Sequence, residues 1–253
     1  MKSLIAVLVS VAVSTAGGQS ADTLFADVGS PAIDARLFQP HAARVRVYRG
    51  DSLVAQWTNE LSLGDSAGRR VMRWVTTGEP VPANPNRPLG VLRQTYDAET
   101  LAPLGYSNVV STGAFSQLRI DGRRVSGTRR TLNDTTVHRV DVTLDQPAYF
   151  AGASDLIPVA AGLRIGSVIV APVWSANAAA VDYRVFSVLR DTTLSIEGSN
   201  VVARKVEERR RSDRSLTAYW YLLTESPYMV YGEVPLPDGR LQRMTEVAIP
   251  TRR

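Results

Sequence analysis

One short motif in the sequence has the form of a known catalytic turn, Gly64-Asp65-Ser66-Ala67-Gly68. It matches Gly-x-Ser-x-Gly, in which the glycines permit a sharp turn from a strand into a helix and expose the serine as a nucleophile. Such a serine needs an imidazole to accept its proton, and His138 is the only histidine that follows Ser66. These two residues define the serine-esterase hypothesis.

The surroundings of the motif argue against that chemistry. The segment before it carries the polar residues Asn59, Glu60 and Ser62, whereas a nucleophile elbow follows a buried strand, and residues 69–75 end in a β-favouring run where a helix should begin. No His-Gly-Gly-Gly segment precedes the serine to supply an oxyanion hole. We therefore expect Ser66 to be a hairpin-loop residue, and we expect no catalytic residue and no enzymatic activity.

The sequence contains few of the residues that usually bind metal ions. There is no cysteine, and His41 and His138 are the two histidines. A zinc site would have to depend on carboxylates, and neither His-Glu-x-x-His nor a calcium-binding loop is present. We expect no metal and no cofactor.

Large aromatic side chains supply the remaining candidates for a binding site. On a closed sheet such residues either fill the core or line an apolar cavity for a hydrophobic ligand. The sequence leaves both readings open. The candidate groove-lining residues are Trp74, Trp174, Tyr219, Trp220 and Tyr221.

The elements that would position these residues are strands. Residues 44–49, 118–120 and 140–144 alternate polar and apolar side chains, the pattern of a strand with one buried face. Longer runs rich in β-favouring residues occupy 52–60, 70–77, 90–97, 181–190, 201–208, 216–224 and 242–249. We expect about ten to thirteen antiparallel strands.

Turn residues separate these runs. Gly50-Asp51, Asp121-Gly122 and Asp238-Gly239 predict hairpins, and the proline-rich residues 79–88 predict a loop. One short helix is expected within 149–162, limited by Pro158. The sequence thus predicts an all-β fold with minor α structure, either a sandwich or a strongly curved antiparallel sheet that closes toward a barrel.

The N-terminus has the form of an export signal. Lys2 precedes an apolar run, and small residues with candidate cleavage sites after Ala16, Gly18 or Ala21 follow it. We expect a signal peptide at 1–21 and a single β domain at 22–253, periplasmic or secreted. It would be free of disulfides and of a lipid anchor, because there is no cysteine.

The charge and hydropathy of the chain limit its partners. The net charge of +5 is mild for a chain of 253 residues, and its densest basic cluster, within 209–214, is interrupted by Asp213. We expect no nucleic-acid partner. Apolar runs shorter than about 20 residues and aromatics in mid-strand argue against membrane-spanning segments.

Three segments carry a family resemblance: 97–104, 155–166 and 220–239. Together they resemble a family of exported bacterial proteins of unknown function, whose curved sheet is similar to that of the periplasmic lipoprotein carriers LolA and LolB. The resemblance implies a half-barrel around one short helix, in the periplasm, with an apolar groove and no assigned catalytic residues. The lipid-anchor cysteine of LolB is absent.

These observations together predict an exported, non-enzymatic protein that binds a hydrophobic, lipid-like ligand or a partner in the cell envelope. Two alternatives remain: a serine esterase that uses Ser66, and a structural or interaction domain without a ligand.

Overall fold

The computed structural model describes residues 22–175 and 180–250, so the predicted signal peptide at 1–21 lies outside the described residues. The strands are β1 (Thr23–Phe25), β2 (His41–Arg49), β3 (Ser52–Ser66), β4 (Arg69–Glu79), β5 (Gly90–Asp97), β6 (Pro103–Val110), β7 (Phe115–Asp121), β8 (Arg124–Arg130), β9 (His138–Thr143), β10 (Tyr149–Phe150), β11 (Val168–Trp174), β12 (Val181–Ile196), β13 (Ser199–Arg210), β14 (Leu216–Leu222), β15 (Met229–Pro235) and β16 (Leu241–Ala248). The helical elements are η1 (Ala35–Leu37), η2 (Ala151–Ala153) and α1 (Leu156–Ala160).

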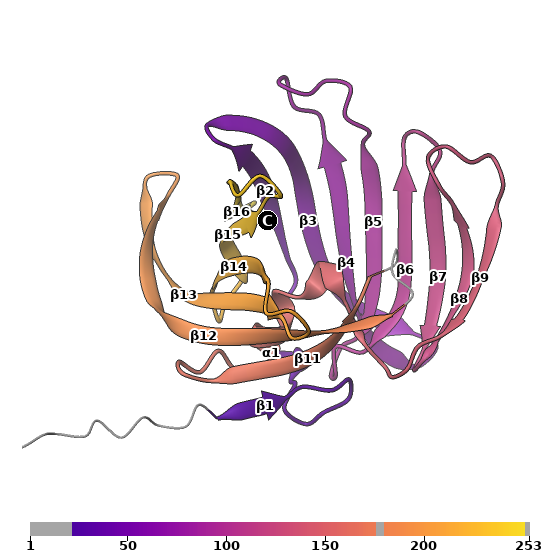
Figure 1. Cartoon of the computed structure of the whole chain (residues 1–253), viewed down its shortest axis with the longest axis horizontal. Coiled ribbons are helices and arrows are strands. Elements are labelled where there is room, and N and C mark those ends of the chain that lie inside the picture. The colour runs from indigo at the N-terminus through magenta and orange to yellow at the C-terminus, as the bar shows by residue number, and fades with distance from the viewer. Residues whose placement is uncertain (1–21, 176–179, 251–253) are drawn as a thin grey trace, which may run out of the picture.

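All sixteen strands belong to one sheet, in the order β1-β11-β12-β13-β14-β15-β16-β2-β3-β4-β5-β6-β7-β8-β9, with β10 also beside β11. Two antiparallel meanders, β11 to β16 and β2 to β9, join where β16 pairs with β2. Among the strands of the described residues, only β1 and β10 pair in parallel, both with β11. The sheet curls so strongly that β11 to β13 cross beneath the upright strands β3 to β9 (Figure 1).

The predicted fold class is confirmed: the protein is a strongly curved, mostly antiparallel sheet with minor helix. Each predicted hairpin turn joins two neighbouring strands, Gly50-Asp51 between β2 and β3, Asp121-Gly122 between β7 and β8, and Asp238-Gly239 between β15 and β16. The proline-rich residues follow Glu79, the last residue of β4, and form the loop before β5.

The sheet has more strands than the sequence patterns predicted. The unpredicted strands include β6, β8, β11 and β15. Six of the seven residues of β11 are buried, so this strand carries no alternation to reveal it. The short helix expected within 149–162 is α1, which spans five residues and has Asp155 as its N-cap residue, and β10 and η2 occupy the first residues of that range.

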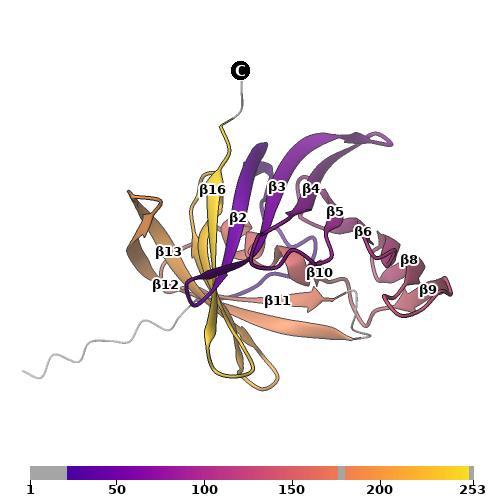
Figure 2. The ribbon, with the colours of Figure 1, turned by 90° about the horizontal axis from the view of Figure 1, so that it is seen from above.

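Residues 149–163, here called the central segment, fill the hollow of the sheet. In α1 the side chains of Leu156, Ile157 and Val159 are at most 2% exposed. The helix ends at Ala160 with Ala161 as its C-cap residue, and Gly162 follows with a φ of +88°, a left-handed conformation that glycine adopts readily. Figure 2 shows β10 inside the curl, next to β11, with which it pairs. We call the face of the sheet that packs on this segment the inner face, and the opposite face the outer face.

Phe150 is the aromatic centre of this packing. Its ring centroid lies 5.9 Å from that of Tyr96, 5.4 Å from that of Tyr106 and 6.0 Å from that of Trp174. Tyr96 and Tyr106 come from the neighbouring strands β5 and β6, and Trp174 comes from β11, which is far from both in the order of the sheet. The central segment therefore joins β11 to the β5–β6 pair, with which β11 does not pair.

The inner face also carries buried carboxyl groups. Glu246 of β16 is 2% exposed, and its Oε1 accepts a hydrogen bond of 3.4 Å from Nδ2 of Asn59. Burial, with a further contribution from the nearby Asp155 carboxylate, raises the pKa of Glu246 to about 8. The pKa values of Asp155 and Glu208 are also raised, in both cases mainly by burial.

These shifts predict a fold that weakens as the pH rises. Between the ordinary pKa of Glu246 near 4.5 and its folded value of about 8, the folded state binds a proton that the unfolded state has lost. Glu246 alone should make the stability fall with a slope of up to about 1.4 kcal/mol per pH unit. Glu246→Gln should flatten that slope in urea melts between about pH 5 and about pH 8. Glu60→Gln on the exposed side of β3 should not, and equal slopes for the two variants would contradict the assignment.

The backbone at Gly127 in β8 leaves no room for a side chain. Its φ is +150°, and a Cβ atom there would lie 2.0 Å from the carbonyl oxygen of Gln117 in the neighbouring strand β7. Both groups are backbone, so neither can rotate away. The close pairing of β7 with β8 therefore depends on the absence of a side chain.

We predict that Gly127→Ala lowers the free energy of unfolding by about 2 to 3 kcal/mol, since it adds both a steric conflict and backbone strain. The matched control is Gly105→Ala in β6, where the nearest atoms to an added Cβ lie at 3.8 Å, an ordinary contact. Thermal melts of both variants test this. A Gly127→Ala protein as stable as the control would contradict it.

Candidate functional site

The longest hairpin of the sheet bends over the outer face and forms one wall of a cleft. β12 and β13 contain 16 and 12 residues, and Glu197 and Gly198 between them have positive φ values of 48° and 82°, as in the two-residue turns that suit hairpins. The tip reaches β2, where the Glu197 carboxylate pairs with the Arg46 guanidinium. The two meanders thus meet a second time, through side chains.

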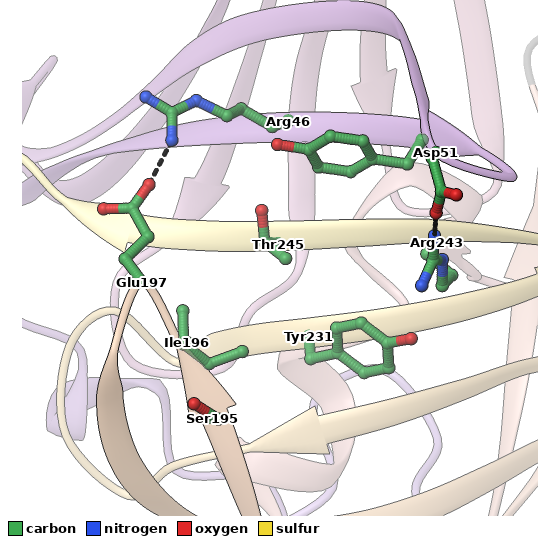
Figure 3. Close-up of a pocket in the computed structure, with 9 residues that line it drawn as sticks. Arg46, Asp51, Ser195, Ile196, Glu197, Tyr231, Arg243 and Thr245 are labelled. Atoms are coloured by element: carbon green, nitrogen blue, oxygen red, sulfur yellow. Dashed lines mark hydrogen bonds and ion pairs between the residues drawn. The ribbon is translucent and has the colours of Figure 1, made fainter.

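The cleft between this tip and the outer face has a volume of about 370 Å³, at the lower end of the roughly 300 to 1,000 Å³ typical of ligand pockets. Figure 3 shows its lining residues gathered from β2, β12, β15, β16 and the adjoining turns. They are Arg46, Tyr48, Asp51, Ser195, Ile196, Glu197, Tyr231, Arg243 and Thr245.

Strand alternation places these side chains on the outer face. In β2, Val45 and Val47 are buried on the inner face, so Arg46 and Tyr48 point outward. The register aligns Tyr231 with Thr245 and Thr245 with Arg46, which makes one row across β15, β16 and β2. The floor of the cleft is therefore fixed by backbone pairing across the seam between the meanders.

Two arginines stand in the cleft, each with a carboxylate partner. Arg46 pairs with Glu197, and Arg243 Nη2 lies 3.2 Å from an Oδ1 of Asp51 and also donates to the carbonyl oxygen of Gly50. The Asp51 side chain is fully exposed, and such surface pairs contribute little free energy. An anionic group of a ligand can therefore replace Asp51 as the partner of Arg243 at small cost.

Tyr231 gives the cleft an aromatic wall. Its ring centroid lies 5.2 Å from that of Tyr221, and both hydroxyls donate to Glu233, at 3.3 and 3.4 Å. Burial is the main cause that raises the pKa of Tyr231 to about 12, so the phenol stays neutral at physiological pH. Behind it, Tyr221 packs with Ala203 and Val230 in a small apolar cluster of the outer face.

The predicted groove residues do not share one groove. Trp74, Trp174 and Trp220 belong to the inner core or pack against it. Trp174 lies against Phe150, and the Trp220 Nε1 donates a 2.7 Å hydrogen bond to Glu208 Oε2. The central segment packs on this face, so the three tryptophans lie in the packed interior or against it.

The other two predicted residues lie on the outer face. Tyr219 and Tyr221 alternate with Trp220 along β14 and therefore point the opposite way. The Lys205 ammonium lies 4.1 Å from the ring centroid of Tyr219 and 5.4 Å from that of Tyr221. Tyr221 stands next to the cleft through its contact with Tyr231, and neither Tyr219 nor Tyr221 lines it.

Ser66 and His138 lie far apart. Ser66 is the last residue of β3, next to the turn at Ala67 and Gly68, and a strand follows where a nucleophile elbow has a helix. The order of the sheet places β4 to β8 between Ser66 and His138, and the registers put the two residues at opposite ends of the sheet. His138 instead contacts Asp134, 2.5 Å away.

Within 22–175 and 180–250, no group of three or more histidine, cysteine, aspartate or glutamate side chains is arranged to hold a metal ion. In the same ranges no helix has the length and apolarity needed to cross a membrane.

The cleft residues were missed because their strands resemble ordinary half-exposed strands. Outward residues such as Arg46 and Arg243 fit the pattern of a solvated face. What converts that face into a cleft is the β12–β13 hairpin, more than a hundred residues from Arg46 in the sequence. The runs Arg44-Val45-Arg46-Val47-Tyr48 and Arg243-Met244-Thr245 contain the residues but no signal for this contact.

Together the sheet and the cleft define a barrel-like, all-β protein with a pocket on its outer face. Among solved structures, the chain is similar to a "Beta-barrel-like Protein of Domain of Unknown Function DUF1849" from Brucella abortus, at 12% sequence identity and a TM-score of 0.45, over 83% of this chain and 95% of that one. No family model and no curated protein matches the chain.

Proposed function

We propose that the protein is an exported, non-enzymatic binding protein of the periplasm or the extracellular space, which holds an amphipathic, lipid-like ligand in the outer-face cleft. The observation that carries the proposal is the combination in one cleft of two tyrosines, Ile196 and two arginines. The family resemblance to lipoprotein carriers supports a lipid-like ligand.

The chemistry of the lining matches a ligand with two unlike ends. Tyr48, Tyr231 and Ile196 offer apolar and aromatic surface to a hydrocarbon body. Arg243 offers a planar donor group to a carboxylate or phosphate. The ion pair between Arg46 and Glu197 holds the β12–β13 hairpin over a ligand in the cleft.

The binding test uses cis-parinaric acid, a fluorescent fatty acid, with oleate as the competitor. Wild type should bind the probe and release it to oleate. Arg243→Ala should weaken binding by about tenfold or more, because a hydrogen bond to a charged group contributes about 1.5 to 3 kcal/mol, and Tyr231→Ala should weaken it through lost apolar contact.

Two matched controls lie outside the cleft. Arg240→Ala removes an exposed arginine that pairs with Asp238, and Tyr219→Ala removes a neighbouring outer-face tyrosine that does not line the cleft. Both should bind the probe as wild type does. Absence of probe binding to wild type would favour the structural or interaction role, and equal loss in the controls would remove the cleft from the proposal.

The location and the molecular mass of the expressed protein test whether it is exported. We expect the full chain, produced in a bacterial host, to be recovered from the periplasm or the medium with Gly17, Gln19 or Asp22 as its first residue. Intact-mass spectrometry distinguishes the three. A protein that keeps Lys2 and stays in the cytosol would contradict the signal-peptide assignment.

A further inference from the structure

A second hollow lies on the outer face of β5 to β8, away from the cleft. It is a shallow groove of about 630 Å³, here called the basic groove. Its lining residues are Arg93, Thr95, Gly105, Tyr106, Ser107, Gln117, Leu118, Arg119, Ser126 and Gly127. The set contains two arginines and no carboxylate, so the groove is cationic.

The two arginines are free to take an external partner. Both side chains are exposed, and among the described residues no ion pair or side-chain hydrogen bond engages Arg93 or Arg119. The carboxylate across from Ser126, that of Asp141 in β9, is already engaged, 3.1 Å from Arg124 and 3.9 Å from Arg139. Among the described residues, therefore, no carboxylate forms an ion pair with either arginine of the groove.

An apolar rim borders the same part of the sheet. Val109 near the end of β6 is 42% exposed, and Leu132 and Val137 in the loop from β8 to β9 are 58% and 52% exposed. The pairings of Val109 with Phe115 and of Phe115 with Arg130 put these residues at one end of the sheet, where Figure 1 shows the β6–β7 and β8–β9 connections together. Ser107 of the groove is two residues from Val109, about 7 Å along the strand.

We infer that this surface docks the protein onto anionic phospholipid membranes. The apolar rim enters the interface between head groups and acyl chains, and Arg93 and Arg119 lie behind it at the level of the phosphates. Charge complementarity selects the occupant, because exposed apolar side chains beside unpaired cations are the arrangement that binds anionic lipid surfaces.

The basic cluster at 209–214, which stands out in the sequence, is less suited to this role. Arg209 lies 2.6 Å from Glu207, and Arg210 lies 3.7 Å from Asp182. Its charge is therefore partly compensated. The basic groove is independent of the outer-face cleft, so the inference does not depend on a ligand in that cleft.

Cosedimentation with vesicles tests the inference. Wild type should bind vesicles of phosphatidylcholine with phosphatidylglycerol, bind pure phosphatidylcholine far less, and lose binding at high ionic strength. The double variant Arg93→Ala/Arg119→Ala should bind the anionic vesicles at least tenfold more weakly, because each basic residue near the surface contributes about 1 kcal/mol. Leu132→Ser/Val137→Ser should weaken binding even at low ionic strength.

The control is Arg49→Ala/Arg164→Ala, which removes the same charge from exposed positions elsewhere and should bind as wild type does. Thermal melts confirm that each variant is folded. Equal binding by the groove variant and the control would overturn the inference. So would binding of inorganic phosphate or of an anionic polysaccharide in the absence of vesicle binding.

Discussion

The inner face of the sheet packs against the central segment, and the rest of the structure depends on this contact. Strands from both meanders bury one side on residues 149–163, whose α1 side chains are almost fully covered. Because side chains alternate along a strand, a buried inner face leaves only the outer face to meet other molecules. The cleft and the basic groove both lie there, and their positions are consequences of how the core is filled.

The packing of the inner face also buries acidic side chains, and this burial disfavours their charged form. Glu246 and Glu208 remain in the interior although burial shifts both toward the protonated form. Around them, Asn59 and Trp220 donate to Glu246 and Glu208, so part of the hydrogen-bonding capacity is satisfied. The hydroxyl of Tyr96 is buried without a partner, and an unsatisfied polar group of this kind weakens the fold. The sheet therefore encloses a polar strip within an apolar core.

The sequence predicted what depends on neighbouring residues. Alternation and turn dipeptides located β2, β7, β9 and three hairpins, because both signals act over a few residues. Buried strands such as β11 lack alternation and were missed. The candidate site required a contact between β2 and the tip of a hairpin near residue 197, and no local pattern encodes it. Aromatic residues on β14 were singled out by size, but alternation divided them between the two faces.

The seam between β16 and β2 has a consequence for how the chain folds. Residues 43–49 pair with residues 242–248, so one of the central pairings of the sheet joins segments separated by nearly the whole chain. Contacts of such long sequence separation form slowly, because a large loop must close first. Until β16 pairs with β2, the edge of β2 stays unpaired, and the meander from β2 to β9 cannot join the meander from β11 to β16. A chain built in this way completes its fold only after β16, the last strand of the described residues, has become available to β2.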